Sequence, residues 1–498
     1  MVSDLVSVEW KQSQDARVTG REISRILYLQ QTAADLPGAP ENSMITTRFL
    51  PIVLVLGSLT PLHAQYKAIF SFGANGDPSC PSTETIAQSP GGNLVSSNAS
   101  LCTTGTENLP AAYEIGYQGA NFTILQEFTE PFEYPISGLT LATDQRFHGT
   151  TNQGGSRNHG TVYRLSPSGE IVYEHDFEGG ADGGYPSTPP IQGADGAFYG
   201  TTNGASSDYA GTVYKIDTSE HYSVLHLFTT TDGRGPSVQL VQGADLNFYG
   251  TTSSGGANGL GTFYRISSTG DFAVLHDFTS ADGGSAGSLT LASDGNFYGV
   301  NLGNNDTNNG AIIRITPTGT VSILYTFAGG QDGSQPSGGV VQATDGNFYG
   351  TLNQEGASGG GTIYRVTPAG VFTKLHDFWV SSGIYPEGTP LQHTSGKLYG
   401  FAYAGGDNDK GVIWEYDPGL APFVTFLNVY GQAGAKVDIL GQYFDSSSVV
   451  LFNGVPAQNP VIQSTYIEAT VPVGATTGYI TVTTSKGILT SNKPFVVN

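Results

Sequence analysis

The sequence predicts an all-β protein: a seven-bladed β-propeller followed by an immunoglobulin-like β-sandwich. Its composition is rich in glycine (69 of 498 residues) and poor in charge (12%), which argues against a helical bundle or a coiled coil. A unit of about 50 residues recurs along most of the chain. After residue 420 that unit stops, and short strands of a different pattern follow. Two β domains are therefore expected, at residues 65–420 and 421–498.

The first 64 residues do not join the repeats. Met44 begins a second plausible start, followed by Arg48, an apolar run of 11 residues (Phe49–Leu59) and Ala64. A cation, a short apolar run and a small residue at the cut site form an export signal, and the run is shorter than the ~20 residues that span a bilayer. We therefore expect residues 44–64 to be a signal peptide cleaved after Ala64. Residues 1–43 are interpreted as an upstream extension outside the mature protein, with a cytoplasmic tail on a membrane anchor as the alternative.

The chain has two cysteines, Cys80 and Cys102, which lie 22 positions apart. In an exported protein two such residues most simply form one bridge. By the chain-entropy model that loop contributes roughly 3 kcal/mol. The spacing matches no metal-ligand pattern, and two unpaired thiols are the alternative. We expect a disulfide between Cys80 and Cys102.

Three markers define the repeat. The first is a ring-ring-glycine step or a close variant of it, whose glycines are Gly149, Gly200, Gly250, Gly299, Gly350 and Gly400. The second is a run that reads Gly-Thr-hydrophobic-Tyr-basic-hydrophobic in its commonest form, beginning at Gly160, Gly211, Gly261, Gly310, Gly361 and Gly411. The third is an alternating apolar run that ends at Phe128, Phe177, Phe228, Phe278, Phe327 and Phe378. A degenerate copy of each marker lies nearer the N-terminus, at Tyr66–Phe72, Pro90–Ser96 and Ala112–Ile115, so each occurs seven times.

The order of the markers predicts a closed ring. The array begins at Tyr66–Phe72, a strand that normally follows the second marker, and it ends near Pro418 on a second marker that lacks its follower. The two ends therefore complement each other. We expect Tyr66–Phe72 to complete the sheet that holds Val412–Tyr416, which closes the ring without an exposed sheet edge.

Within each unit the local pattern is that of β-strands. Short β-branched and aromatic runs alternate with turn clusters such as Thr344–Asn347 and Ser293–Asn296, which is hairpin chemistry. Four strands fit in one unit, and that is the size of a propeller blade. A β-helix or a leucine-rich horseshoe would have a shorter period. The sequence therefore predicts seven blades.

The repeat closely resembles the GloVer (Gloeo_Verruco) tandem repeat of exported bacterial proteins. The shared pattern is Asp-Gly-Asn-Phe-Tyr-Gly-Thr, a Gly-Gly loop, Gly-Thr-hydrophobic-Tyr-Arg-Ile and Leu-His-Asp-Phe, over about 66–418. The resemblance implies an exported, propeller-like architecture and brings no established activity. The C-terminal apolar helix with a basic tail, which would supply the anchor implied by the family name, does not follow here.

The C-terminal segment, residues 421–498, has closely spaced strands with glycine turns, which is typical of a small sandwich. It resembles an IPT/TIG immunoglobulin-like domain through Gly441–Phe444, Val450–Gly454 and Val471–Val482. This resemblance implies a structural or interaction module.

Residues that recur at one position in several units are interpreted as packing residues. His175, His226, His276 and His376 share one strand position. Asp176, Asp277 and Asp377 are predicted to pair with Arg164, Arg265 and Arg365 of the preceding strand. A further set, Asp182, Asp232, Asp282 and Asp332, each precedes a glycine; we expect turns there, with bound Ca²⁺ as the alternative.

Residues that break the repeat are the candidates for ligand binding: His148, Arg157, His159, Trp379 and Trp414. His148 replaces the usual tyrosine, Arg157 and His159 lie in the adjoining glycine loop, and the two tryptophans are the only ones after residue 64. Aromatic rings beside Asn and Asp suit sugar rings and their hydroxyls, so a glycan is a reasonable ligand class.

The predicted function is that of a secreted or cell-surface protein that binds or scaffolds without catalysis, because no unique catalytic cluster stands out. A glycan or protein ligand is expected, with no cofactor and a monomeric chain that has no membrane span in its mature form. The formal charge of −22 disfavours nucleic acids as partners. The alternative is a carbohydrate-active lyase or hydrolase that uses one propeller face.

Overall fold

The computed structural model describes residues 65–73, 81, 85–98, 109–129, 134–135, 137–204, 210–301 and 309–498, and all of them fall in one compact unit. The predicted signal peptide (44–64), the extension (1–43) and both members of the predicted disulfide, Cys80 and Cys102, lie outside these residues. Over the described ranges, no helix has the length and apolarity that a membrane crossing requires.

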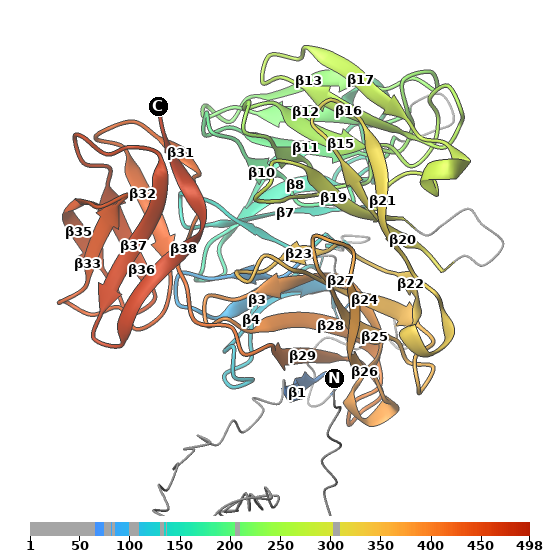
Figure 1. Ribbon diagram of the computed structural model, residues 1–498. Helices are drawn as coiled ribbons and strands as arrows, with labels where there is room; N and C mark the ends of the chain where they lie inside the picture. Colours follow the sequence, from blue (N-terminus) through green and yellow to red (C-terminus); the bar gives the residue numbers. More distant parts are fainter. Residues whose placement is uncertain are drawn as a thin grey trace, which may run out of the picture. The chain divides into compact units, whose positions relative to one another are not determined.

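Seven antiparallel sheets follow one another along the described chain (Figure 1). Sheets 1 to 3 are β2 (Ala87–Gln88), β3 (Leu94–Asn98), β4 (Ala111–Ile115), β5 (Thr123–Glu127); β6 (Thr140–Leu141), β7 (Phe147–Thr151), β8 (Thr161–Leu165), β9 (Ile171–Asp176); and β10 (Ile191–Gln192), β11 (Phe198–Thr202), β12 (Thr212–Ile216), β13 (Tyr222–Leu227). Sheets 4 and 5 are β14 (Val241–Gln242), β15 (Phe248–Thr251), β16 (Thr262–Ile266), β17 (Phe272–Asp277); and β18 (Thr290–Leu291), β19 (Phe297–Asn301), β20 (Ala311–Ile315), β21 (Val321–Thr326).

Sheets 6 and 7 complete the set. They are β22 (Ser334–Pro336), β23 (Val341–Gln342), β24 (Phe348–Gln354), β25 (Thr362–Val366), β26 (Phe372–Asp377); and β27 (Ile384–Gln392), β28 (Leu398–Ala404), β29 (Val412–Asp417), with β1 (Gln65–Ser71). Short 3-10 turns precede four of the sheets: η1 (Gly180–Asp182), η2 (Ser280–Asp282), η3 (Gly330–Asp332) and η4 (Val380–Ser382).

The two ends of the repeat array meet in sheet 7. Strand β1 pairs antiparallel with β29, and the register runs from Gln65 opposite Asp417 to Ser71 opposite Val412. Buried residues of sheets 7 and 1 also share one cluster that includes Phe72, Tyr113 and Tyr399. The predicted ring closure is therefore confirmed, and the fold of residues 65–420 is a β-propeller.

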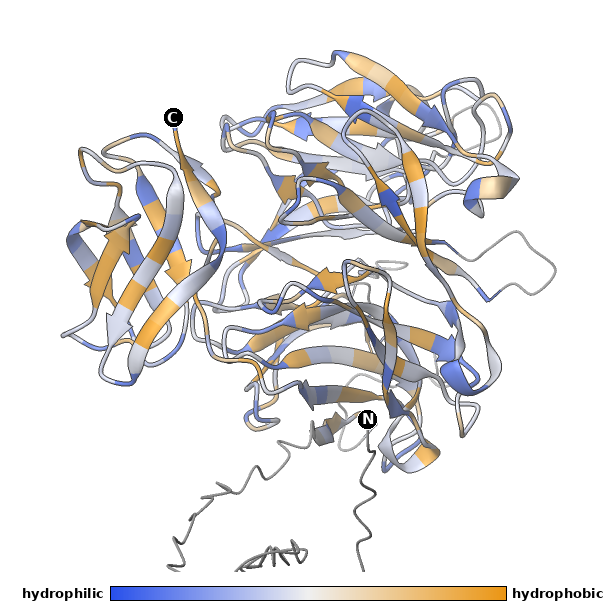
Figure 2. Cartoon of the chain, in the orientation of Figure 1, coloured by the Kyte–Doolittle hydropathy of each residue, from blue (hydrophilic) through white to orange (hydrophobic). Residues whose placement is uncertain are grey.

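The first strand of each sheet lies nearest the axis of the ring. β2 contacts β6, β14 contacts β18 and β23 contacts β27, so these short strands face one another. The fourth strands form the outside, where β9 and β21 alternate between partly buried and exposed residues. Figure 2 shows the same mixture of hydrophobic and hydrophilic residues along the strands.

The ring-ring-glycine marker is explained by packing within and between sheets. Gly200 lies opposite Tyr214 in the ladder, and a Cβ on Gly200 would come within 2.3 Å of the Tyr214 hydroxyl. The glycine therefore makes room for the tyrosine of the second marker. The ring before the glycine stacks on the next sheet: the centroid of Tyr199 lies 3.9 Å from that of Phe248. The repeat motif is thus the interface between blades.

Residues 421–498 form the predicted β-sandwich. One sheet contains β30 (Thr425–Phe426), β32 (Lys436–Leu440), β36 (Tyr466–Thr470) and β35 (Gln458–Ile462). The other contains β31 (Tyr430–Gly431), β38 (Gly487–Val497), β37 (Gly478–Thr484), β33 (Val449–Phe452) and β34 (Val455–Pro456). Their inner faces share a core that includes Phe426, Phe452 and Phe495.

Candidate functional site

The propeller has two chemically different faces. The turn face carries the hairpins that join the first and second strands, such as Gly193–Gly196. The loop face carries the glycine-rich loops between the second and third strands, together with η1 to η4. On the loop face, the loop of one sheet bonds the start of the next: the Tyr185 N–H donates to the His159 carbonyl at 2.7 Å.

The C-terminal domain lies against the turn face. Its side chains bond the turns of four sheets: Thr465 Oγ1 donates to the Pro90 carbonyl (2.7 Å), Gln145 Nε2 donates to the Tyr466 hydroxyl (3.1 Å), Tyr430 donates to the Gly243 carbonyl (3.0 Å), and Gln442 Nε2 donates to Thr394 Oγ1 (2.9 Å). These four turns belong to sheets 1, 2, 4 and 7. The domain therefore lies across this end of the ring.

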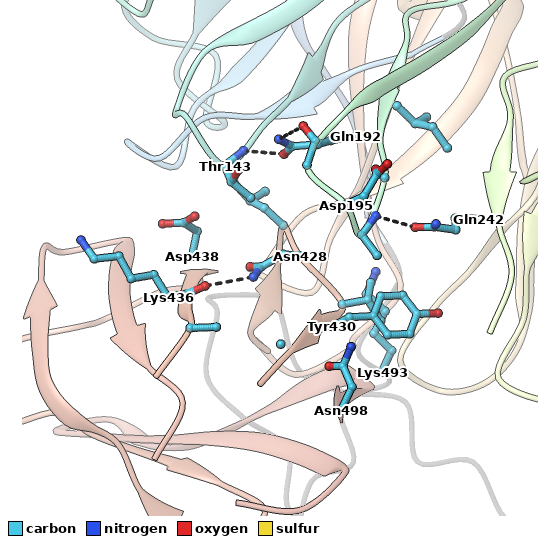
Figure 3. A pocket seen from close by; sticks show the side chains of 18 of the residues that line it. Thr143, Gln192, Asp195, Gln242, Asn428, Tyr430, Lys436, Asp438, Lys493 and Asn498 are labelled. Carbon is cyan, nitrogen blue, oxygen red and sulfur yellow. Dashed lines mark hydrogen bonds between the residues drawn. The ribbon is translucent and has the colours of Figure 1, made fainter. Parts of the chain in front are cut away.

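A cavity of about 920 Å³ remains between the turn face and the C-terminal domain (Figure 3). Of the five charged side chains that line it in the described ranges, four have bonded partners: Asp195, Lys436, Glu468 and Asp438, which accepts from the Tyr466 hydroxyl; Lys493 is the fifth. Asp195 accepts from Tyr199 (2.7 Å) and Lys215 (3.0 Å), which together hold its pKa below the usual range against the opposing effect of burial. Lys436 forms a 2.7 Å ion pair with Glu468. Because this cavity lies where the two domains join, it is better explained as a joint between domains than as an entry site.

Glutamines at the ends of the first strands tie neighbouring sheets together. Each side-chain oxygen accepts from a backbone N–H in the turn of the preceding sheet; the pairs are Gln88 with Thr394, Gln192 with Thr143, Gln242 with Ala194, Gln342 with Ser293, and Gln392 with Thr344. Leu141 and Leu291 take this position in sheets 2 and 5. A leucine cannot form this bridge, so the turns of the preceding sheets, 1 and 4, receive no glutamine. The Thr465 hydroxyl bonds the turn of sheet 1, and the Tyr430 hydroxyl bonds the turn of sheet 4. The C-terminal domain thus contacts the two turns that lack a glutamine.

The loop face opens into a second cavity, of about 470 Å³, between sheets 4, 5, 6 and 7. Among the residues that the structure describes, its lining is uncharged: the polar members are Ser237, Ser253, Ser285, Ser288, Asn301, Ser337 and Thr389, and most of the rest are glycines. Hydroxyl groups both donate and accept hydrogen bonds. This lining suits a neutral ligand rich in hydroxyl groups.

The repeated histidines pack between blades, as predicted. The His175 ring stacks on Tyr222 of the next sheet at 3.5 Å, His226 on Phe272 at 3.7 Å, and His376 on Tyr66 at 3.9 Å. Burial lowers the pKa of His376 to about 4, so the ring is neutral at neutral pH. These three rings are engaged in contacts between sheets.

The predicted pairs between Asp176, Asp277, Asp377 and the arginines are wrong. The carboxylates instead cap the glycine loops, accepting from the N–H groups of Ser156, Ala257 and Ala357 at 2.6–2.8 Å. The reason is register: Arg164 lies opposite Val172 near the hairpin, while Asp176 lies opposite Thr161 at the other end of the ladder. Arg164 bonds Glu174 (3.2 Å) and Glu220 (2.6 Å), and Arg365 bonds Thr373 (3.3 Å).

The aspartates that precede a glycine form turns, as expected. Asp182 and Asp282 accept backbone N–H bonds from Glu178 and Thr279 at 2.8 Å and lie 3.1 and 3.0 Å from His175 and His276. Where the structure describes the chain, no three His, Cys, Asp or Glu residues gather as a metal site would require.

His148 is buried between sheets 2 and 3, with 1% of its surface exposed. Its ring stacks on Phe198 at 3.8 Å, and Tyr199, Tyr249 and Tyr298 make the matching ring contact in sheets 3 to 5. Burial lowers its pKa, but bonds and charges from Asp144 and Glu174 outweigh this and raise the pKa above the ordinary value. His148 therefore replaces tyrosine at a position that packs between two sheets.

The remaining candidates from the sequence do not gather at one point. Trp414 is fully buried in sheet 7, where its indole N–H donates to the Phe401 carbonyl at 2.9 Å. Arg157 is exposed in the loop between β7 and β8, and His159 lies edge-on to Tyr185 at 5.4 Å. Trp379 is 52% exposed and immediately precedes η4. The last three residues belong to the loop face.

Sequence reasoning missed Glu387. It lies one residue after Pro386 in β27, at the position that Ser187, Ser237 and Ser337 take in other sheets. Burial raises the pKa of this carboxyl. The sequence does hold a signal for it: among the residues that follow Pro186, Pro236, Pro336 and Pro386, only Glu387 is acidic.

The fold and its two faces define a repeat protein of the propeller class with an appended immunoglobulin-like domain. Family models agree with both parts: the Gloeobacter/Verrucomicrobia repeat matches residues 81–301, 180–341 and 285–439, and the IPT/TIG domain matches residues 422–497. The chain therefore belongs to the Gloeobacter/Verrucomicrobia repeat family.

Similar solved structures are distant. They include a copper-containing fungal alcohol oxidase of the AA5 family (14% identity, TM-score 0.46, covering 84% of this chain and 98% of that one). An oligogalacturonate lyase from Vibrio parahaemolyticus has 12% identity and a TM-score of 0.48, covering 72% and 94%. A putative 6-phosphogluconolactonase from Bacteroides uniformis has 15% identity and a TM-score of 0.43, covering 62% and 89%. No curated protein matches the chain in sequence.

Proposed function

We propose that the protein is exported and binds a neutral, hydroxyl-rich ligand, a glycan, at its loop face without transforming it. The observation that carries this proposal is the uncharged lining of the loop-face cavity, where serine hydroxyls and the Asn301 amide are the polar groups. Such groups bind sugars but cannot exchange protons near neutral pH as a general acid or base does. The apolar run Phe49–Leu59 supports export.

The position of the C-terminal domain supports the choice of face. The domain bonds turns of sheets 1, 2, 4 and 7, so the turn face is the side on which the two domains join. The loop face carries no such cover among the described residues, and Trp379 is exposed there. A ligand would therefore approach from the loop face.

One observation favours the rival function, a carbohydrate-active lyase or hydrolase. A carboxyl group whose pKa is raised by burial can act as a general acid, and Glu387 is such a group on a first strand. Against this, the residues expected to assist it do not gather beside it: His148 lies between sheets 2 and 3, whereas Glu387 is in sheet 7.

A glycan array with the purified protein tests the proposal when retention and product release are both recorded. Retention of a neutral glycan without product supports binding. Turnover of any polysaccharide would overturn the non-catalytic proposal. In that case Glu387→Gln should abolish turnover but keep retention, and Glu355→Gln, an exposed glutamate of the neighbouring loop, is the matched control.

A further inference from the structure

The residue that precedes the proline at the start of a first strand has a left-handed backbone in four sheets. The φ values are 57° at Tyr185, 65° at Gly235, 58° at Gln335 and 59° at Tyr385. Each N–H donates to a carbonyl in the loop of the preceding sheet, at 2.7, 2.8, 3.2 and 2.8 Å respectively. The backbone conformation therefore recurs in four sheets, but not at Ser285, the matching residue of sheet 5; the four left-handed residues together are called the rim.

Glycine is the residue that this conformation favours, because any Cβ is strained at positive φ. Gly235 shows that glycine fits the rim. Tyrosine is a costly choice, since bulky residues are rare in this region and such outliers concentrate at ligand sites. Two of the four rim positions nevertheless carry tyrosine.

Burial of the tyrosine rings does not offset the strain of their left-handed backbone. Tyr385 is 40% exposed, and Trp379, six residues before it, is 52% exposed. Tyr185 is partly exposed and meets His159 edge-on at 5.4 Å. Ser285, at the matching position of sheet 5, lines the loop-face cavity, and so do Ser237 and Ser337, which lie two residues after Gly235 and Gln335. Aromatic rings of sheets 3 and 7 that are at least partly exposed therefore lie on the same face as this hydroxyl-lined cavity, beyond its lining residues.

Resting on the proposed function, we propose that the rim binds an extended, neutral polysaccharide, with the faces of sugar rings stacked on Tyr185 at one side and on Tyr385 and Trp379 at the other. The tyrosines start sheets 3 and 7, which are four sheets apart along the chain and three apart around the closed ring, so one sugar residue does not contact both. The formal charge of −22 disfavours an anionic polymer. The ligand is thus a neutral chain of several residues.

The test compares Tyr185→Gly, Tyr385→Gly and Trp379→Ala with Gln335→Gly, a matched control because it removes a non-aromatic side chain from the same left-handed rim position. Retention of the full-length protein on insoluble cellulose, β-1,3-glucan, xylan and mannan is measured, together with the urea midpoint. We expect the two tyrosine variants to keep or raise the midpoint and to bind about tenfold more weakly, a loss of ~1.4 kcal/mol. Gln335→Gly should bind as the wild type does.

Two results would overturn the inference while leaving the proposed function standing. One is wild-type retention by both tyrosine variants, or a lowered midpoint that shows the rings to be packing elements. The other is competition by a monosaccharide at the concentration where its hexamer competes, because an extended site favours the longer chain. Failure of the wild-type protein to bind any polymer in the panel would overturn the proposed function as well.

Discussion

Tyr66 and His376 lie parallel, with ring centroids 3.9 Å apart and an angle of 5° between their planes. Tyr66 belongs to the first strand of the propeller, β1, while His376 belongs to β26 of sheet 6. The Tyr66 hydroxyl also donates to the Ser382 carbonyl. One side chain near the start of the array therefore fastens the strand that completes sheet 7 to sheet 6.

Replacing Tyr66 with alanine should weaken the closure of the ring. Tyr66→Ala loses the stack on His376 and an edge contact with Phe378 at 5.5 Å, so we expect a loss of about 2–3 kcal/mol in the free energy of unfolding. Urea denaturation measures it. Val371→Ala, at a side chain that is 60% exposed, is the control and should change stability by less than about 0.5 kcal/mol. Equal effects of the two variants would contradict the role of the stack.

Gly200→Ala should destabilise the protein because its Cβ would lie 2.3 Å from the Tyr214 hydroxyl. Overpacking of this kind costs about 1–3 kcal/mol. The same Cβ would lie 2.4 Å from the ring carbon Cζ of Tyr214, so the partner variant must remove the whole ring: Tyr214→Ala, which alone should cost about 3–5 kcal/mol. In the double variant the two effects should not add: a smaller cost of Gly200→Ala in the Tyr214→Ala background supports the steric explanation, and strict additivity in the double-mutant cycle would refute it.

His393 should make the protein less stable in mild acid. Its Nδ1 accepts from the Ser395 N–H (3.1 Å) and its Nε2 lies 2.9 Å from the Gly92 carbonyl. Burial lowers its pKa from 6.5 to about 4. The unfolded chain therefore binds the proton more readily, so stability is complete above pH 6.5 and falls as the pH drops toward 4, by up to about 3 kcal/mol.

Denaturant titrations of His393→Asn between pH 7 and pH 4 check this expectation. The variant lacks the titrating ring, so its stability should fall less steeply than that of the wild type over the same range. His221→Asn, at an exposed histidine, is the matched control and should keep the wild-type slope. An unchanged slope in His393→Asn would show that other groups cause the acid sensitivity.

The glutamine bridges should differ in strength according to burial. Gln88 is 6% exposed and forms two hydrogen bonds with Thr394. The Gln88 side-chain oxygen accepts from the Thr394 N–H (3.0 Å), and the Gln88 side-chain amide donates to the Thr394 hydroxyl (2.9 Å). Gln88→Leu leaves buried groups unpaired and should cost about 1–3 kcal/mol. Gln242→Leu should cost less than about 1 kcal/mol, because the Ala194 N–H that it frees belongs to an exposed residue that water can reach. Urea denaturation of both variants measures the two losses of stability. A larger loss in Gln242→Leu than in Gln88→Leu would contradict the role of burial.

The propeller, including its closure, could be predicted because the information is local and repeated. The offset between Tyr66–Phe72 and Val412–Tyr416 is visible in the order of the markers. The partner of Asp176 could not be predicted, because its carboxylate accepts from the Ser156 N–H in a glycine loop whose path the strand pattern does not define. Nor could the rim, since the left-handed backbone of Tyr185 depends on a carbonyl of another sheet, that of His159. Long-range contacts set both features.

The pairing of β1 with β29 has a consequence for how the array falls apart. In a linear stack of repeats the terminal units have one neighbour and fray first. Here every unit has two neighbours, so no unit can detach until the seam formed by β1 has opened. Opening of that one strand would therefore govern the protein's lifetime against proteases and heat.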